Sequence, residues 1–190
     1  MGQPRRHSTL RGRHADRSFG VKRLWVLRHA KSSWSHEGLA DHDRPLNRRG
    51  ERAAVLIGAA LAQRGVQLDR ILASTALRVR QTLDRVQAQL AAPLHVSFEK
   101  DLYLASAETW LEQLRCLEEA DQVLAVGHNP GLEDLLGEIA ATGETDALRR
   151  LRHGLATATL AEIALPIADW GELGPGSGRL ITLLRPKDLV

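Results

Sequence analysis

Residues 24–29 read Leu-Trp-Val-Leu-Arg-His, four apolar residues followed at once by an arginine and a histidine. A short continuous apolar run is typical of a strand that helices cover on both faces. In open α/β sheets, functional side chains lie just beyond the carboxyl ends of the strands. We therefore interpret Leu24–Leu27 as a central strand, and Arg28 and His29 as candidate site residues.

Strand and helix patterns alternate after this first strand, beyond a long loop at Ala30–Leu46. Strands separated by helices of 10 or more residues predict a mainly parallel sheet between two layers of helices, a three-layer α/β/α domain. The elements that we expect are a helix capped by Asn47 and ended by Gly65, strand Arg70–Ala73, helix Ala76–Leu90, strand Leu94–Phe98, helix Ala107–Leu117, strand Gln122–Val126, a helix capped by Asn129 that runs from Pro130 to about Ala141, and strands Thr157–Ala164 and Arg179–Leu184.

The chain has 190 residues, of which 43% are hydrophobic and 26% charged, so disorder of the whole chain and a coiled coil are excluded. The net charge of +3 is uneven, because residues 1–23 carry seven of the 26 Lys and Arg and one of the 23 Asp and Glu. Residues 24–190 therefore carry −3. We interpret residues 1–22 as a basic, disordered arm and residues 23–190 as one folded domain, and we expect no nucleic-acid partner.

A single cysteine, Cys116, excludes a disulfide framework and a thiolate-rich metal site, and we expect it to be a buried structural thiol. The longest apolar runs, such as Ala53–Ala62, are shorter than the roughly 20 residues that span a bilayer. The first residues lack the charged, apolar and small regions of an export signal. We expect a cytoplasmic protein without a membrane partner.

Polar side chains follow three of the predicted strands, whose carboxyl ends meet at one edge of a parallel sheet. Arginine offers planar pairs of N–H donors that fit a tetrahedral oxyanion, and helix N-termini add backbone donors. A neutral imidazole nitrogen is a nucleophile at phosphorus when the other ring nitrogen is held as a donor to a carbonyl. The pattern predicts a phosphate site made by Arg28, His29, Arg78 and His128.

The segments that hold these residues resemble the motifs of the histidine phosphatase superfamily, the clan of phosphoglycerate mutases and acid phosphatases. Leu27–Ser32 is similar to its Arg-His-Gly signature, Ser74–Thr82 to its second motif, and Val126–Pro130 to its distal histidine motif. Asp43–Gly50 resembles the Pro-Leu-Thr-x-x-Gly segment that opens the first helix. The variants Arg-His-Ala-Lys-Ser-x-Trp and Asp-x-x-Arg-Pro-Leu are most similar to SixA-type phosphohistidine phosphatases.

The resemblance implies a phosphoglycerate mutase-like fold in which His29 takes the phosphoryl group. It also implies that Arg28 and Arg78 hold the phosphoryl oxygens and that His128 donates to them. Because positioned cations and N–H donors stabilise the charge of phosphoryl transfer, we expect neither a metal nor a cofactor. Further candidate contacts to the substrate are Lys31, Ser32, Ser35 and Asn129.

Two positions depart from the family pattern. Leu104 stands where broader members carry a glutamate acid, which leaves Glu108, or Asp101, as the candidate acid. Ser35 stands where mutase-like members carry a phosphate-contacting asparagine. A missing acid hampers expulsion of an alkoxide more than expulsion of an imidazole, so the departure at Leu104 favours phosphohistidine or another labile substrate.

Two other groups of residues have competing interpretations. Asp41-His42-Asp43 is either a set of metal ligands or a loop that is ion-paired near Arg44, and the ion-paired loop is favoured because no second ligand cluster accompanies it. The four tryptophans are expected in the core, with the mouth of the site as the alternative for Trp34 and Trp110.

We therefore expect a metal-independent phosphatase of signal transduction that acts through phospho-His29, with a phosphohistidine protein as its substrate and partner. One alternative is a phosphomonoesterase or mutase of the same fold that acts on a small phosphorylated metabolite. An alternative of another class is a phosphate-dependent binding module without catalysis. The sequence does not indicate the oligomeric state.

Overall fold

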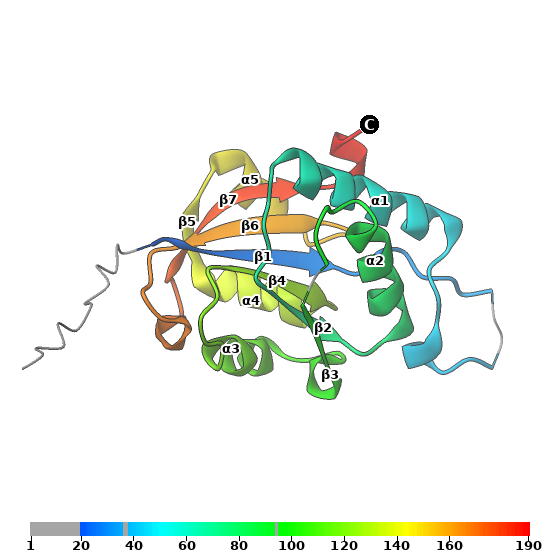
Figure 1. The fold of residues 1–190 in the computed structure, drawn as a ribbon, viewed down its shortest axis with the longest axis horizontal. Coiled ribbons are helices and arrows are strands. Elements are labelled where there is room, and N and C mark those ends of the chain that lie inside the picture. Colours follow the sequence, from blue (N-terminus) through cyan, green and yellow to red (C-terminus); the bar gives the residue numbers. More distant parts are fainter. Residues whose placement is uncertain (1–19, 36–37, 94) are drawn as a thin grey trace, which may run out of the picture.

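The computed structural model describes residues 20–35, 38–93 and 95–190. Most of the expected basic arm therefore lies outside the described residues, and the first strand begins at Lys22, one residue before the expected domain boundary. The fold is built on a seven-stranded sheet of order β3-β2-β4-β1-β6-β7-β5 (Figure 1). The strands are β1 (Lys22–Arg28), β2 (Arg70–Ser74), β3 (Val96–Glu99), β4 (Gln122–Gly127), β5 (Ala140–Gly143), β6 (Leu160–Leu165) and β7 (Gly178–Leu184).

Four of the strands, β3, β2, β4 and β1, are consecutive parallel neighbours, and β5 is parallel to β7. Only β6 runs antiparallel to its neighbours, β1 and β7. The expected mainly parallel sheet is confirmed. Because β1 lies beside β4 and β4 beside β2, the carboxyl ends of these three strands meet at one edge.

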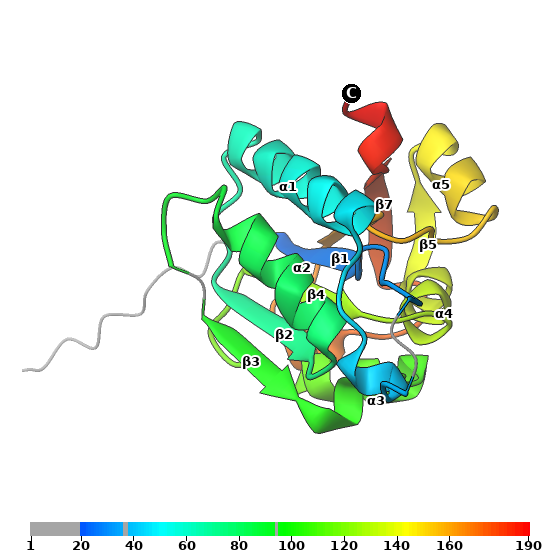
Figure 2. The same cartoon turned by 90° about the vertical axis from the view of Figure 1, so that its right-hand side faces the viewer.

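Helices cover both faces of the sheet, α1 and α2 on one face and α3 and α4 on the other (Figure 2). The first strand shows why: Leu24 and Val26 belong to the hydrophobic cluster on one face, and Trp25 and Leu27 to the cluster on the other. The expected three-layer α/β/α domain is confirmed. The helices are α1 (Arg48–Gln63), α2 (Leu77–Gln87), α3 (Ala107–Arg115), α4 (Gly131–Ile139) and α5 (Thr145–Leu151).

The start of α1 fastens the loop that follows β1. The side chain of Asn47 accepts a hydrogen bond from the Gly50 amide at 2.9 Å, as expected of its cap. Gly50 packs directly on this loop, since a Cβ at that position would lie 2.2 Å from the carbonyl oxygen of Lys31. The backbone N–H of Asn47 also donates to that oxygen. The segment after His29 is thereby held against the helix.

Sequence patterns missed the edge strand β5 and helix α5, and extended the preceding helix too far. The chain leaves α4 after Ile139, and Ala140–Gly143 pairs with β7 instead. The expected cap by Asn129 is wrong: Pro130 occupies the cap position, and the Asn129 side chain bonds elsewhere.

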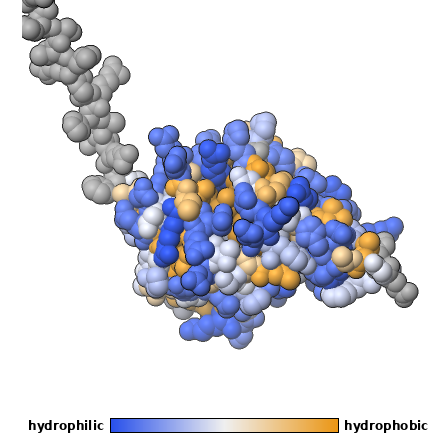
Figure 3. Space-filling model, turned by 90° about the horizontal axis from the view of Figure 1, so that it is seen from below, coloured by the Kyte–Doolittle hydropathy of each residue, from blue (hydrophilic) through white to orange (hydrophobic). Residues whose placement is uncertain are grey.

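Two expectations about burial are also corrected. Cys116 is exposed at the end of α3, and Trp34 is 76% exposed rather than in the core. The other tryptophans are buried, Trp110 completely. On the face shown in Figure 3, hydrophobic residues lie in patches among hydrophilic ones. Within the described ranges, no helix is both long and apolar enough to cross a membrane.

Candidate active site

The two candidate histidines lie side by side because the strands that precede them are parallel neighbours. Arg28, the last residue of β1, pairs in register with Gly127, the last residue of β4. His29 and His128 follow at once, and their ring centroids are 5.0 Å apart. A Cβ at residue 127 would lie 2.6 Å from the ring of Trp110, so a glycine is needed beside His128.

His29 has one ring nitrogen fixed as a donor. Its Nδ1 lies 2.8 Å from the carbonyl oxygen of Ala30, and a carbonyl only accepts, so Nδ1 carries the proton and Nε2 is left with a free lone pair. Burial, assisted by the charges of Arg78 and Arg28, lowers the pKa of His29 to about 4 against the opposing bond to Ala30. The ring is therefore neutral at pH 7 and suited to nucleophilic attack.

His128 is held by the residues on either side of it. A guanidinium nitrogen of Arg78 lies 3.3 Å from Nδ1, so Nδ1 accepts, and Nε2 then donates to Oγ of Ser74 at 2.9 Å. Burial lowers the pKa of His128 to about 3, and His29 and Arg78 act in the same direction. Two neutral histidines thus face one arginine.

Arg78 is almost fully buried and is oriented by Asp41. It donates to the backbone carbonyl of Asp41 and, at 2.9 Å, to its carboxylate. The same carboxylate accepts from Tyr103 at 2.7 Å and from Arg44 at 2.8 Å. The hydrogen bond from Tyr103 lowers the pKa of Asp41 to about 2, assisted by Arg78 and Arg44 and opposed by burial. Asp41 is therefore ionised and fixes the direction of the Arg78 guanidinium.

Arg28 is held from the opposite wall. Its Nη1 donates to the carbonyl oxygen of Leu155 at 2.7 Å, and its buried Nε has no partner among the described residues. Glu133 fixes that wall, because its carboxylate accepts from the Leu155 amide at 2.8 Å and from the Asn129 side chain at 2.7 Å. Burial lowers the pKa of Arg28, and the charge of Glu133 opposes this effect.

These side chains surround a cavity of about 360 Å³. Of the described residues, four cationic ones line it, Arg28, Lys31, Arg44 and Arg78, and Asp41 is the one carboxylate. An excess of fixed guanidinium donors in a small cavity suits an anion with several oxygens. The site can therefore bind a tetrahedral oxyanion next to a neutral imidazole.

The expected site residues fall into two groups. The cavity is lined by Arg28, His29, Lys31, Ser32, Arg78, His128 and Asn129. The structure does not bring Ser35 or Glu108 to it. Ser35 is exposed and bonds with the Ser33 hydroxyl, and Glu108 is exposed in the first turn of α3. Leu104, at the position of the missing acid, does line the cavity, with a φ of 53°.

Several lining contacts had no clear signal in the sequence. The ion pair between Asp41 and Arg44 confirms the favoured interpretation of that loop, but the pairing of Asp41 with Arg78 was not expected. The Arg44 guanidinium also donates to Ser32 and lies 3.2 Å from the ring centroid of Trp34. The Asp-x-x-Arg spacing indicates the expected pair, because it places two groups of opposite charge three residues apart, whereas no local spacing indicates the pairing of Asp41 with Arg78.

Tyr103 was missed altogether. Its ring meets that of His128 edge to face, with centroids 5.5 Å apart, while its hydroxyl bonds Asp41. No local pattern around Tyr103 indicates its contact with Asp41, because the two residues are 62 positions apart in the chain. Among the described residues, no group of three or more His, Cys, Asp or Glu is placed to hold a metal ion.

Comparisons with known proteins agree with this geometry. A family model, the histidine phosphatase superfamily (branch 1), matches residues 24–103. An uncharacterized protein of Mycobacterium tuberculosis (strain H37Rv) is 34% identical over 164 residues, which are 85% of this chain and 100% of that protein. A crystal structure from Agrobacterium tumefaciens, of a protein proposed to be the phosphohistidine phosphatase SixA, is 34% identical with a TM-score of 0.72 and covers 87% of this chain and 98% of its own. The protein histidine phosphatase SixA complexed with tungstate is 24% identical, covers 88% of this chain and 99% of its own, and has the same fold with a TM-score of 0.72.

Proposed function

Because the chain belongs to the histidine phosphatase superfamily, we propose that it removes the phosphoryl group of phosphohistidine in a protein through a covalent intermediate on His29. The family and its SixA relatives support phosphatase activity. The substrate and the intermediate are inferred from the cavity. The observation that carries the proposal is the state of His29, a buried neutral ring whose Nδ1 donates to Ala30 and whose Nε2 is free.

In the first step, Nε2 of His29 attacks phosphorus while the bond from phosphorus to the substrate nitrogen breaks. The two electrons of that bond leave with the substrate ring, which departs as neutral imidazole when its other nitrogen is already protonated. Charge spreads over the three phosphoryl oxygens in such a transfer. Arg28 and Arg78 supply fixed donors for these oxygens, which costs little reorganisation as the charge develops.

Among the described residues, the ionised Asp41 is the one carboxyl group that lines the cavity, and this lack of a protonated acid favours phosphohistidine over a phosphate ester. Leu104 lines the cavity at the position where an acid was sought, and Glu108 lies outside it. An alkoxide leaving group needs a proton at the moment of departure, whereas an imidazole with one protonated nitrogen does not. A site without an acid therefore discriminates in favour of the nitrogen-bound phosphoryl group.

In the second step, water attacks the phosphorus of phospho-His29. The bond from phosphorus to Nε2 breaks, neutral His29 is restored with its proton on Nδ1, and inorganic phosphate is released. While the phosphoryl group is attached, the ring with a protonated Nδ1 is cationic, and the carbonyl of Ala30 stabilises that charge. A cationic ring is a good leaving group. The proposed cycle needs no metal and no cofactor.

The test measures hydrolysis of a phosphohistidine peptide by the wild-type protein and by His29→Ala. The expected result is turnover by the wild type, none by the variant, and a base-stable, acid-labile phosphoryl group on His29 in rapid-quench samples. His95→Ala is the matched control, because His95 is exposed and lies before β3, away from the cavity. Full activity of the His29 variant would refute the mechanism.

Two further measurements separate the alternatives. A chelator is expected to leave the rate unchanged, and a loss restored by a divalent metal would contradict the metal-free cycle. An alkyl phosphate ester such as glycerol 3-phosphate is expected to be the poorer substrate, because its alkoxide leaving group needs a proton. A preference for the ester would favour a small-molecule phosphomonoesterase, and binding without turnover of either compound would favour a binding module.

A further inference from the structure

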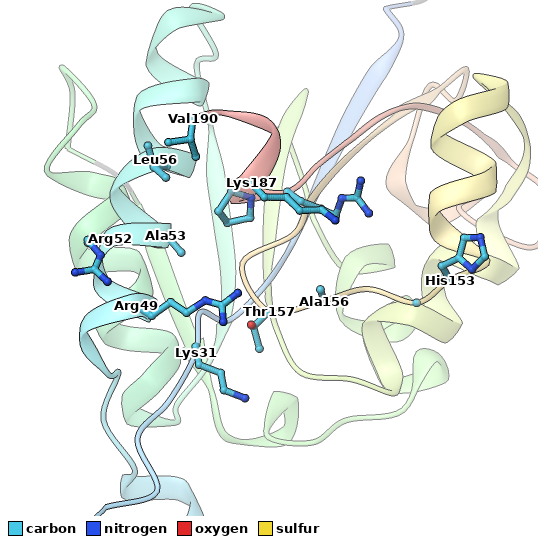
Figure 4. A pocket seen from close by; sticks show the side chains of 13 residues that line it. Lys31, Arg49, Arg52, Ala53, Leu56, His153, Ala156, Thr157, Lys187 and Val190 are labelled. Atoms are coloured by element: carbon cyan, nitrogen blue, oxygen red, sulfur yellow. The ribbon is translucent and has the colours of Figure 1, made fainter.

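A larger hollow lies directly beside the catalytic cavity. Its volume is about 590 Å³, against about 360 Å³ for the cavity, and Lys31 and Thr157 line both. One wall is the first half of α1, another is the segment 153–157, and the C-terminal residues 185–190 lie between them (Figure 4). We call this space the basic groove. The basic groove adjoins the cavity, and a phosphoryl group bound in the cavity would not fill it.

The groove combines an apolar lining with a cationic rim. Ala53, Leu56 and Val190 supply apolar surface from α1 and from the end of the chain. Lys31, Arg49, Arg52 and Lys187 stand exposed around it (Figure 4), whereas neither Asp nor Glu lines it.

These four rim cations have no neutralising partner in the part of the chain that the structure describes. Among the described residues, none of them forms an ion pair with a carboxylate, in contrast to Arg185 of the same groove, which pairs with Asp188. The positive rim is not a consequence of overall charge either, since residues 24–190 carry −3. A cluster of unpaired cations on a negatively charged domain is a local feature that attracts an anionic partner.

We propose, on the basis of the phosphohistidine phosphatase function above, that the basic groove docks an acidic amphipathic segment of the phosphorylated protein. Apolar side chains of that segment would cover Leu56 and Val190, and its carboxylates would pair with Arg49, Arg52 and Lys187. Laying an amphipathic helix into an apolar groove with a charged rim is a recurring mode of recognition. Lys31, which lines both spaces, stands between the docked segment and the phosphoryl group.

A protein segment fits better than a small metabolite because the groove exceeds the catalytic cavity in volume and is open along the surface. The phosphoryl group needs only the cavity. Side chains of a larger partner can bury the remaining apolar lining, which stabilises the complex. Electrostatic complementarity selects an acidic partner. The substrate protein is thereby recognised through a surface next to its phosphohistidine.

The experiment uses two synthetic peptides of equal length, each with one phosphohistidine followed by an amphipathic helix. One peptide carries Glu on the polar face and the other carries Gln. The groove variant is Arg49→Glu with Arg52→Glu. The control with the same change of charge is Arg48→Glu with Arg64→Glu, at the two ends of α1 and outside the groove. Free phosphohistidine serves as the substrate that does not reach the groove.

With the groove variant, the ratio of kcat/KM for the Glu peptide to kcat/KM for free phosphohistidine is expected to fall about tenfold, because two attractive contacts become repulsive. The control pair and the Gln peptide are expected to show less than a threefold change of this ratio. Binding of the unphosphorylated Glu peptide to the wild type, followed by fluorescence anisotropy, should weaken as NaCl is raised.

An unchanged ratio in the groove variant, or equal binding of the Glu and Gln peptides, would overturn the docking proposal while leaving the phosphatase intact. The proposal would also be overturned if neither peptide displaced the other and a small organic anion such as a nucleotide bound tightly in the groove. Failure of the wild type to hydrolyse free phosphohistidine and both peptides would instead refute the proposed function. The anisotropy measurement then still decides whether the groove binds acidic peptides.

Discussion

The neutral state of His29 predicts a specific dependence of stability on pH. His29 is 8% exposed, and its pKa is lowered in the folded protein from 6.5 to about 4, first by burial. Acid therefore favours the unfolded chain, in which the same ring accepts a proton more readily. This histidine has no effect on stability well above pH 6.5, and it destabilises the folded protein increasingly as the pH falls from 6.5 toward 4. Replacing it by asparagine should remove that dependence.

The size of the effect follows from the two pKa values. At pH 8 neither the folded nor the unfolded ring is protonated, so His29 adds nothing to the difference between the states. At pH 5 the unfolded ring is almost fully protonated and the folded ring is not, which costs the native state about 2 kcal/mol. His128 contributes a similar cost in both proteins. The difference between His29→Asn and wild type therefore isolates one ring.

The assay is urea unfolding at pH 8 and pH 5, followed by the fluorescence of the buried Trp25, Trp110 and Trp170. The unfolding free energy of His29→Asn minus that of wild type is expected to be about 2 kcal/mol larger at pH 5 than at pH 8. Asparagine is chosen because its amide can still donate to the carbonyl of Ala30. For His95→Asn, at an exposed site, the difference from wild type should be the same at both pH values. If the difference between His29→Asn and wild type were also equal at pH 5 and pH 8, the reasoning would be refuted, because the ring would then not be held neutral by burial.

Three further outcomes are expected. Arg78→Lys should lower kcat/KM by about 10²- to 10³-fold in steady-state assays, because one ammonium cannot replace a fork that bonds Asp41 and, in the proposed mechanism, the phosphoryl oxygens; a loss under threefold would contradict that role. Inorganic phosphate at 100 times its Kd should stabilise the protein by about 2.7 kcal/mol in thermal unfolding, and Arg78→Ala should need far more phosphate for the same shift. Gly131→Ala should destabilise by about 3 kcal/mol, because its Cβ would lie 1.8 Å from the carbonyl oxygen of Ala105; an unchanged melting temperature would show that this contact can relax.

The sequence was most informative where local pattern and topology agree. The apolar run at Leu24–Leu27 predicts a doubly covered strand, and β1 is buried on both faces. The histidines could be placed together because each directly follows a strand, so that parallel pairing alone brings His29 next to His128. Asn47 and Gly65 could mark a helix, since a side-chain cap and a positive φ depend on near neighbours.

Errors arose where a contact distant in the chain overrides the local preference. The helical pattern extends to about Ala141, but pairing with β7 draws Ala140–Gly143 into the sheet. Asn129 resembles a cap, but its amide is used by Glu133 and by the carbonyl of Leu155 in the wall of the cavity. Ser35 was named by its position in the family pattern, and Glu108 as a substitute for the acid missing at Leu104. The backbone directs Ser35 in its loop and Glu108 in the first turn of α3 away from the cavity, and this geometry is not readable from the sequence.

One set of charges satisfies two requirements of the site at once. A nucleophilic imidazole must remain neutral, and a phosphoryl dianion must be attracted. In the proposed mechanism Arg28 and Arg78 serve both, since a nearby cation lowers the pKa of His29 and would also bind the anion. A carboxylate in place of Leu104 would oppose both, because it would raise the pKa of the histidines and repel the phosphoryl oxygens. The apolar side chain at this position is therefore consistent with a phosphatase whose leaving group needs no acid.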